Sequence, residues 1–96
     1  MRVDLRGIHV DVTNNVKEYF DRKIQKLDFA KDIIIDLLVT LSKEKSSFKI
    51  EATINFRWGN SAHVSFESFD VLQGIDGIID KLETKVTKEK EKIQQR

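Results

Sequence analysis

The stretch FKIEATINFR, residues 48–57, decides the fold of this 96-residue chain. Its apolar side chains occupy every second position, and polar or charged side chains lie between them. This period of two is typical of a β-strand with one buried and one exposed face. Gly59 and Asn60 then provide a turn signal, after which the alternation resumes at residues 61–67. The two segments therefore predict an antiparallel hairpin.

Two segments nearer the N-terminus also have the pattern of strands. Residues 33–41 are densely apolar but still alternate, and the polar cluster at residues 42–47 predicts a turn into the strand that begins at Phe48. Residues 2–6 alternate Val3 and Leu5 with charged side chains and predict a first strand. The side chains expected in the core are Ile35, Leu37, Val39, Ile50, Ile54, Val64 and Phe66.

Two further segments have the apolar spacing of amphipathic helices. The first follows Thr13, a favourable N-cap, and its apolar positions are Val16, Tyr19, Phe20, Ile24 and Leu27. The second begins near residues 68–70, and its apolar stripe comprises Val71, Leu72, Ile75, Ile78, Ile79, Leu82, Val86 and Ile93. The order βαβββα predicts an α+β fold: a four-stranded mixed sheet with both helices on one face, similar to double-stranded-RNA-binding domains.

Length and composition limit the class of protein. With 96 residues, 40% of them hydrophobic and 34% charged, residues 1–96 are expected to form a single domain. The chain has no cysteine and no long apolar run, so we expect a cytoplasmic protein without disulfides, thiolate metal ligands or membrane contact. The net charge is only +1, and any argument for a nucleic-acid partner must therefore come from where the charges lie.

The charges are sorted along both predicted helices. On a helical projection, Lys81, Lys85, Lys88 and Lys92 fall within about 60° of one another. The acidic side chains Asp76, Asp80, Glu83 and Glu91 fall on the other side of the apolar face, and Glu89 and Lys90 are exceptions to the sorting. In the first helix, Arg22, Lys23 and Lys26 occupy one flank, opposite Glu18, Asp21 and Asp28.

Like charges three or four residues apart repel, so this sorting costs local helix stability. One interpretation involves no binding partner: the lysines stabilise the negative end of the helix dipole, and the run of charges is a face exposed to solvent. Because the sorting occurs in two helices, we favour a surface for a polyanion, with structured RNA as the partner. A protein-interaction domain with an acidic partner is a further alternative. The candidate RNA-binding residues are Arg22, Lys23, Lys26, Lys81, Lys85, Lys88 and Lys92.

Catalytic motifs are not evident. His9 and His63 lie in different elements, and no serine has the context of a nucleophile elbow. The GxxG at residues 74–77 lies inside a helical pattern rather than between two helices, which argues against a KH domain. Trp58 is expected to pack at the end of a hairpin. We therefore expect no enzymatic activity, cofactor, metal or small-molecule substrate.

Several stretches are similar to the bacterial ribosome hibernation promoting factor family, also called ribosome-associated inhibitor or protein Y. They include the opening strand at residues 3–7, the helix entry at residues 10–13, and the strand at residues 48–54. The most specific similarity is Glu67 to Asp70, followed by Ile75-Asp76 and residues 80–83, with Lys88 and Lys90 beyond. The chain departs from the family at Leu72, Thr84, Thr87 and Glu89.

The resemblance covers nearly the whole chain and implies the same βαβββα fold. It also implies a translation inactivator that binds the small ribosomal subunit and its rRNA in the decoding cleft and keeps ribosomes idle. The chain resembles the short class of the family and is expected to be a monomer when free. The alternative is a generic structured-RNA-binding module with no ribosomal role.

Overall fold

The computed structural model describes the backbone of residues 1–94 and the side chains of residues 1–92. The elements are β1 (Arg2–Ile8), α1 (Asn14–Lys23), the 3₁₀ helix η1 (Ile24–Ala30), β2 (Ile34–Lys43), β3 (Phe48–Phe56), β4 (Ser61–Ser68) and α2 (Val71–Gln94). This order confirms the predicted βαβββα sequence of elements. The first helix differs in one respect, because its last turns tighten into the 3₁₀ geometry of η1.

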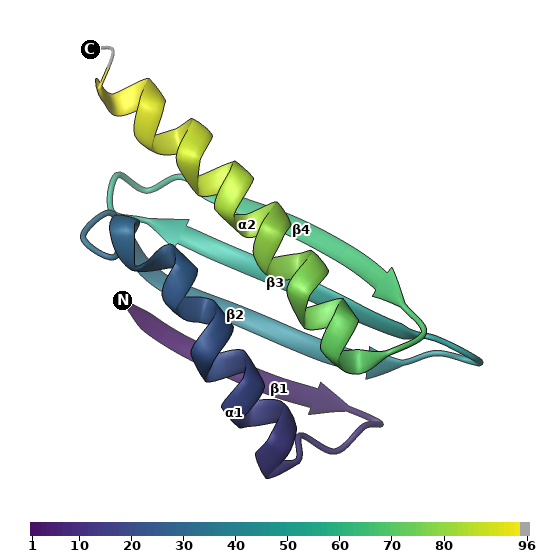
Figure 1. The fold of residues 1–96 in the computed structure, drawn as a ribbon. Coiled ribbons are helices and arrows are strands. Elements are labelled where there is room, and N and C mark those ends of the chain that lie inside the picture. Colours follow the sequence, from purple (N-terminus) through teal and green to yellow (C-terminus); the bar gives the residue numbers. More distant parts are fainter. Residues whose placement is uncertain (95–96) are drawn as a thin grey trace.

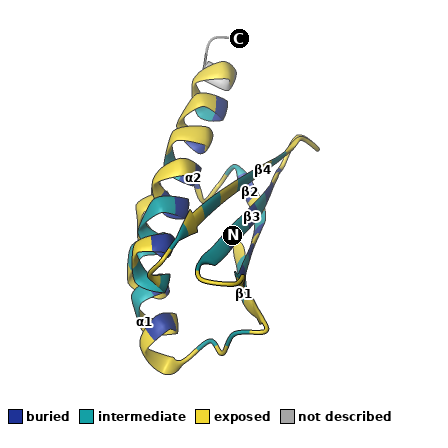
Figure 2. Cartoon of the chain, turned by 90° about the vertical axis from the view of Figure 1, so that its right-hand side faces the viewer, coloured by how far each residue is buried: buried dark blue, intermediate teal, exposed yellow. Residues whose placement is uncertain are grey.

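The four strands form one mixed sheet in the order β1-β2-β3-β4. β1 pairs in parallel with β2, and the pairs β2–β3 and β3–β4 are antiparallel, as the sequence predicted. α1 and α2 cover the same face of the sheet and run in the same general direction (Figures 1 and 2). The opposite face is left uncovered by helices, so the charged flanks of both helices lie on a single side of the molecule.

The core lies between the sheet and the two helices. Phe20 and Leu27 enter it from α1 and η1, and α2 contributes Ile75, Ile78 and Leu82, each at most 1% exposed. The predicted core positions Leu37, Val39, Ile50 and Ile54 are likewise buried. Val64 and Phe66 are only partly buried, although they pack against the core, because β4 is an edge strand.

The prediction that Ile35 belongs to the core is wrong. Ile35 is 48% exposed, whereas its neighbour Ile34 is completely buried. The register of the β2–β3 pair shifts between Ile34 and Asp36, which reverses the inward and outward positions at the start of β2. A bulge of this kind changes the face to which each side chain points, and simple alternation cannot reveal it.

Local contacts define where α1 begins and how closely α2 packs on the sheet. The hydroxyl of Thr13 accepts a hydrogen bond from the backbone N–H of Val16, which confirms the predicted N-cap. In α2, a Cβ at Gly77 would lie only 2.3 Å from the ring of Phe66, and one at Gly74 would lie 2.3 Å from Ile50. The two glycines therefore allow α2 to approach β3 and β4 closely. The side chain of Ile93, predicted on the apolar stripe, lies outside the described residues.

The close approach of α2 to β4 determines where its lysines project. Lys81, Lys85 and Lys88 follow Gly77 on the same side of the helix and therefore extend over the edge strand. Over the described part of the chain, no helix is both long and apolar enough to cross a membrane.

Candidate nucleic-acid interface

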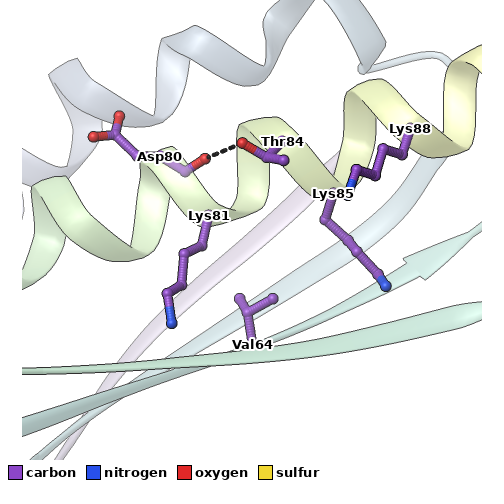
Figure 3. Close-up of a pocket in the computed structure, with 6 residues that line it drawn as sticks. All are labelled: Val64, Asp80, Lys81, Thr84, Lys85 and Lys88. Atoms are coloured by element: carbon purple, nitrogen blue, oxygen red, sulfur yellow. Dashed lines mark hydrogen bonds between the residues drawn. The ribbon is translucent and has the colours of Figure 1, made fainter.

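One flank of α2 and the edge strand β4 form a groove with a cavity volume of ≈ 360 Å³ (Figure 3). Its lining residues are Val64, Asp80, Lys81, Thr84, Lys85 and Lys88. Three of the four lysines predicted as a ladder on α2 are thus gathered around one concave surface. We call this surface the α2–β4 groove.

Lys81 is held in place by contacts with β4. Its ammonium donates a hydrogen bond of 2.8 Å to the backbone carbonyl oxygen of Ser65 and lies 5.6 Å from the centroid of the Phe66 ring. A carbonyl dipole and an aromatic face attract a cation without neutralising it. Lys81 is therefore oriented at the groove without being paired to a carboxylate of the described residues.

Lys85 and Lys88 are exposed and form no ion pair with the described residues. Figure 3 shows the Lys85 side chain extending toward β4, below the helix. Lys92, the last member of the ladder, has an exposed side chain that forms an ion pair of 3.5 Å with Glu89. The least compensated positive charge of α2 therefore belongs to Lys85 and Lys88.

The two exceptions to the charge sorting in α2 have structural roles. Glu89 is 6% exposed and accepts a hydrogen bond of 3.5 Å from the side-chain amide of Asn60, in the β3–β4 hairpin. Lys90 donates a 2.8 Å hydrogen bond to the carbonyl oxygen of Phe29 and lies 5.5 Å from the centroid of that ring. Glu89 thus fastens α2 to the hairpin, and Lys90 fastens it to the end of η1.

The opposite flank of α2 faces α1 and η1 through a set of polar contacts. Lys23 Nζ lies 3.7 Å from Asp76 Oδ1, and Lys26 Nζ lies 3.4 Å from Asp80 Oδ1. The Tyr19 hydroxyl lies 2.7 Å from both carboxylate oxygens of Asp76 and donates a hydrogen bond to that carboxylate. We call these five residues the inter-helix seam.

The hydrogen bond to Asp76 raises the pKa of Tyr19 above its ordinary value of 10.0. Desolvation and the negative charge of the carboxylate act in the same direction, while the nearby Arg22 acts against them. The hydroxyl therefore stays protonated and keeps donating to the seam throughout the neutral range.

The seven predicted residues do not form one uninterrupted positive surface. Asp76 and Asp80 lie between the α1 group and the α2 ladder, and they pair with Lys23 and Lys26. Arg22 remains exposed, and its guanidinium lies 5.6 Å from the centroid of the Tyr19 ring. The structure therefore brings Lys81, Lys85 and Lys88 together and sets Arg22, Lys23 and Lys26 apart from them.

The side chain of Lys23 behaves as its position near the apolar face of α1 predicts. It is 37% exposed, and its ammonium lies 5.4 Å from the centroid of the Tyr19 ring and 3.7 Å from Asp76 Oδ1, so the side chain is partly covered and its charged end is held at the inter-helix seam. The other six candidates are exposed.

Sequence reasoning missed two features of this part of the protein. Val64 was predicted only as a core residue, but it also lines the groove, because an inward position on an edge strand remains half-exposed. On the uncovered sheet face, His63 contacts Thr53 Oγ1 at 3.0 Å and Glu51 Oε2 at 3.3 Å. The sequence shows only that all three lie on outward positions; the pairing register brings them together.

Comparisons with known proteins match almost the entire chain. The family model described as Sigma 54 modulation protein / S30EA ribosomal protein matches residues 3–94. A ribosome hibernation promoting factor from Escherichia coli strain K12 is 35% identical over 95 residues, which cover 99% of each protein. The ribosome hibernation promoting factor of Pseudomonas putida strain KT2440 is 33% identical over 94 residues, or 98% of this chain and 91% of that protein.

Two solved structures resemble this one closely. A ribosomal subunit interface protein from Coxiella burnetii aligns with a TM-score of 0.86 and 23% identity, covering 94% of this chain and 98% of that one. The N-terminal domain of Thermus thermophilus Protein Y aligns with a TM-score of 0.80 and 27% identity, covering 92% and 98% respectively. The first likeness supports the fold alone, and the second agrees with the family match.

Proposed function

The chain belongs to the Sigma 54 modulation protein / S30EA ribosomal protein family, which includes the ribosome hibernation promoting factors, and we propose that it inactivates ribosomes by binding to them. More specifically, residues 1–96 form one ribosome-binding domain that occupies the decoding cleft of the small subunit and contacts its rRNA. The protein does this without catalysis and in the cytoplasm. The relatives named above carry the ribosomal role in their names, and their similarity extends over the full length of this chain.

The observation that carries this proposal is the grouping of Lys81, Lys85 and Lys88 around the α2–β4 groove. RNA phosphates attract such ammonium groups, and binding releases condensed counterions whatever the base sequence. Contacts of this kind position a protein on folded RNA and carry little sequence information. A rigid helix flank over a sheet edge therefore suits the recognition of a folded rRNA surface by its shape.

The second basic group has a smaller role in this proposal. Arg22 is exposed, whereas Lys23 and Lys26 each share their charge with a carboxylate of α2. An RNA phosphate near Lys23 or Lys26 must compete with that carboxylate, which reduces the gain from the contact. We therefore place the main affinity on Lys81, Lys85 and Lys88 of the α2 ladder, and a supporting contribution on Lys92, which pairs with Glu89, and on the α1 group.

Inactivation then follows from occupancy of the cleft. Messenger and transfer RNA cannot enter the decoding cleft while the protein fills it, so the ribosome remains assembled but idle. The rigid core leaves little to be ordered on binding, apart from the lysine side chains themselves. No covalent step is needed.

Binding to separated ribosomal subunits tests the proposal. Labelled protein should sediment with small subunits and not with large ones, and an excess of transfer RNA with a short messenger should displace it. The added protein should slow cell-free translation over the same concentration range. Equal affinity for an arbitrary RNA duplex would indicate a generic RNA-binding module instead. Binding that survives complete nuclease digestion of the RNA would indicate a protein partner.

A further inference from the structure

The α2–β4 groove is a shallow depression as well as a basic surface, and this combination allows a second kind of ligand. We propose that it binds the oligophosphate chain of a small molecule, either a nucleotide or an inorganic phosphate chain, and that this ligand competes with the ribosome. The competition rests on the function proposed above, while the binding itself does not. The proposal concerns free ligands and not the rRNA backbone.

The spacing of the three lysines favours linked phosphates over a single one. Lys81, Lys85 and Lys88 lie on successive turns of α2, and a rise of 1.5 Å per residue spreads their Cα atoms over about 10 Å along the axis. Because the Lys81 ammonium is held against the Ser65 carbonyl, a single phosphate can contact all three ammonium groups only if the Lys85 and Lys88 side chains both turn toward Lys81. A linear chain of phosphates lying along the groove can contact each in turn.

All three ammonium groups are available without breaking an ion pair to a described residue. Lys85 and Lys88 form none with the described residues. Lys81 is held over Phe66 and against the Ser65 carbonyl, so its orientation is largely fixed before a ligand arrives. Binding therefore costs less side-chain entropy at Lys81 than it would at a free surface lysine.

The one acidic residue that lines the groove, Asp80, pairs with a lysine outside it. Figure 3 shows the carboxylate of Asp80 directed away from Lys81 and Lys85. It lies 3.4 Å from the ammonium of Lys26, on the side of the inter-helix seam. The backbone carbonyl oxygen of Asp80 accepts a 3.1 Å hydrogen bond from the Thr84 hydroxyl, so the Thr84 side chain lies along the helix. The groove thus presents three positive charges with no unpaired carboxylate among its lining residues.

The floor of the groove suits a ligand with an apolar part. Val64 lines it from β4, and the methylene stems of the lysines border it. A volume of ≈ 360 Å³ lies in the range of about 300–1,000 Å³ that is usual for small-molecule sites. A nucleoside could rest on Val64 while its phosphates contact Lys85 and Lys88.

Amide NMR titration of the full chain tests the binding. The probes are adenosine triphosphate, inorganic triphosphate and adenosine monophosphate, each added without divalent metal at matched ionic strength. We expect the two triphosphates to shift the amide signals of Val64, Lys81, Thr84 and Lys85 and to bind more tightly than the monophosphate. The double variant Lys85→Gln with Lys88→Gln should weaken triphosphate binding at least about tenfold. The charge-matched control Lys31→Gln with Lys45→Gln should bind like the wild type.

The relative affinities of the probes distinguish the sources of the oligophosphate. Tighter binding of adenosine triphosphate identifies a nucleotide that uses Val64, whereas equal binding identifies an inorganic phosphate chain. The proposal is overturned if the monophosphate binds as tightly as the triphosphates. It is also overturned if the shifts lie mainly at the inter-helix seam, or if the control variant loses as much affinity as the groove variant.

A separate assay tests the competition. Triphosphate at a concentration that saturates the groove should release the protein from small subunits, relative to chloride of equal ionic strength. Retention on the subunits with the groove saturated would refute competition. If the protein binds no subunits at all, the proposed function fails, and the NMR result still decides whether the groove binds oligophosphate.

Discussion

The two flanks of α2 have opposite charges and opposite kinds of neighbour. The acidic flank faces α1 across the inter-helix seam, where Asp76 and Asp80 meet Tyr19, Lys23 and Lys26. The basic flank faces β4, where Gly77 allows the helix backbone to lie against Phe66 and no carboxylate of the described residues pairs with Lys85 or Lys88. The negative charges of the acidic flank are thus paired with lysines within the fold, whereas Lys85 and Lys88 of the basic flank have no such partner among the described residues. The uncompensated side is the one open to an external polyanion.

The largest expected effect comes from reversing the charge of the basic flank. Lys85→Glu with Lys88→Glu should reduce affinity for ribosomes by about a hundredfold, because two phosphate contacts become repulsive. The slope of log K against log salt, expected near −3 to −4 for the four-lysine ladder, should become shallower by about two. Sedimentation binding at several salt concentrations measures both quantities.

The same double variant should unfold almost as the wild type does, since exposed substitutions usually change stability by about 0.5 kcal/mol or less. The control Lys31→Glu with Lys45→Glu changes the net charge equally but lies outside the proposed interface. Unaltered ribosome affinity in the Lys85 and Lys88 variant would mean that the basic flank is only a solvated helix face.

The next effect concerns the close packing that supports the basic flank. Gly77→Ala places a methyl group against the Phe66 ring, where three ring atoms lie within 2.6 Å of the added carbon. Overpacking costs about 1–3 kcal/mol against a gain of about 1 kcal/mol in helix propensity, so we expect a net loss of up to about 2 kcal/mol. Urea unfolding measures this change. Gly74→Ala should cost less, because its nearest contact is the terminal methyl group of Ile50.

A smaller effect should follow from breaking the acidic flank. Asp76→Ala removes the acceptor of the Tyr19 hydroxyl and the partner of Lys23, and it should lower stability by about 1 kcal/mol or less. Because it also frees Lys23, ribosome affinity should stay the same or rise. Asp80→Ala, which removes only the exposed pair with Lys26, should change stability by about 0.5 kcal/mol or less. A marked loss of ribosome affinity in either variant would contradict the division into two flanks.

The smallest effect is a pH dependence at the seam. The folded protein holds the proton of Tyr19 more tightly than the unfolded chain, whose tyrosine pKa is about 10. This contribution to stability is complete below about pH 10 and is lost as the pH rises through the higher folded-state pKa. Urea unfolding at several alkaline pH values should show this loss in the wild type. A loss of the same size in Tyr19→Phe would assign it to other groups.

The sequence was sufficient to predict the strands and helices and which side chains share a face of each. Strict alternation at residues 48–57 identified β3, and Thr13 marked the start of α1 with its side chain as the cap. The sequence also placed Lys81, Lys85 and Lys88 on one flank of α2, because an α-helix has a fixed period. It did not reveal the bulge that buries Ile34 instead of Ile35, since the shift exists only in the pairing of β2 with β3.

The sequence by itself determined which side chains share a face of each element, because the periods of strands and helices are local properties of the backbone. Only the tertiary structure decided which faces meet. It placed Asp76 and Asp80 between the two basic groups, where they pair with Lys23 and Lys26, and it gathered Lys81, Lys85 and Lys88 over β4. Lys26 and Asp80 are 54 positions apart in the sequence, so their ion pair depends on how the two helical segments pack on one sheet. No local sequence pattern encodes that packing.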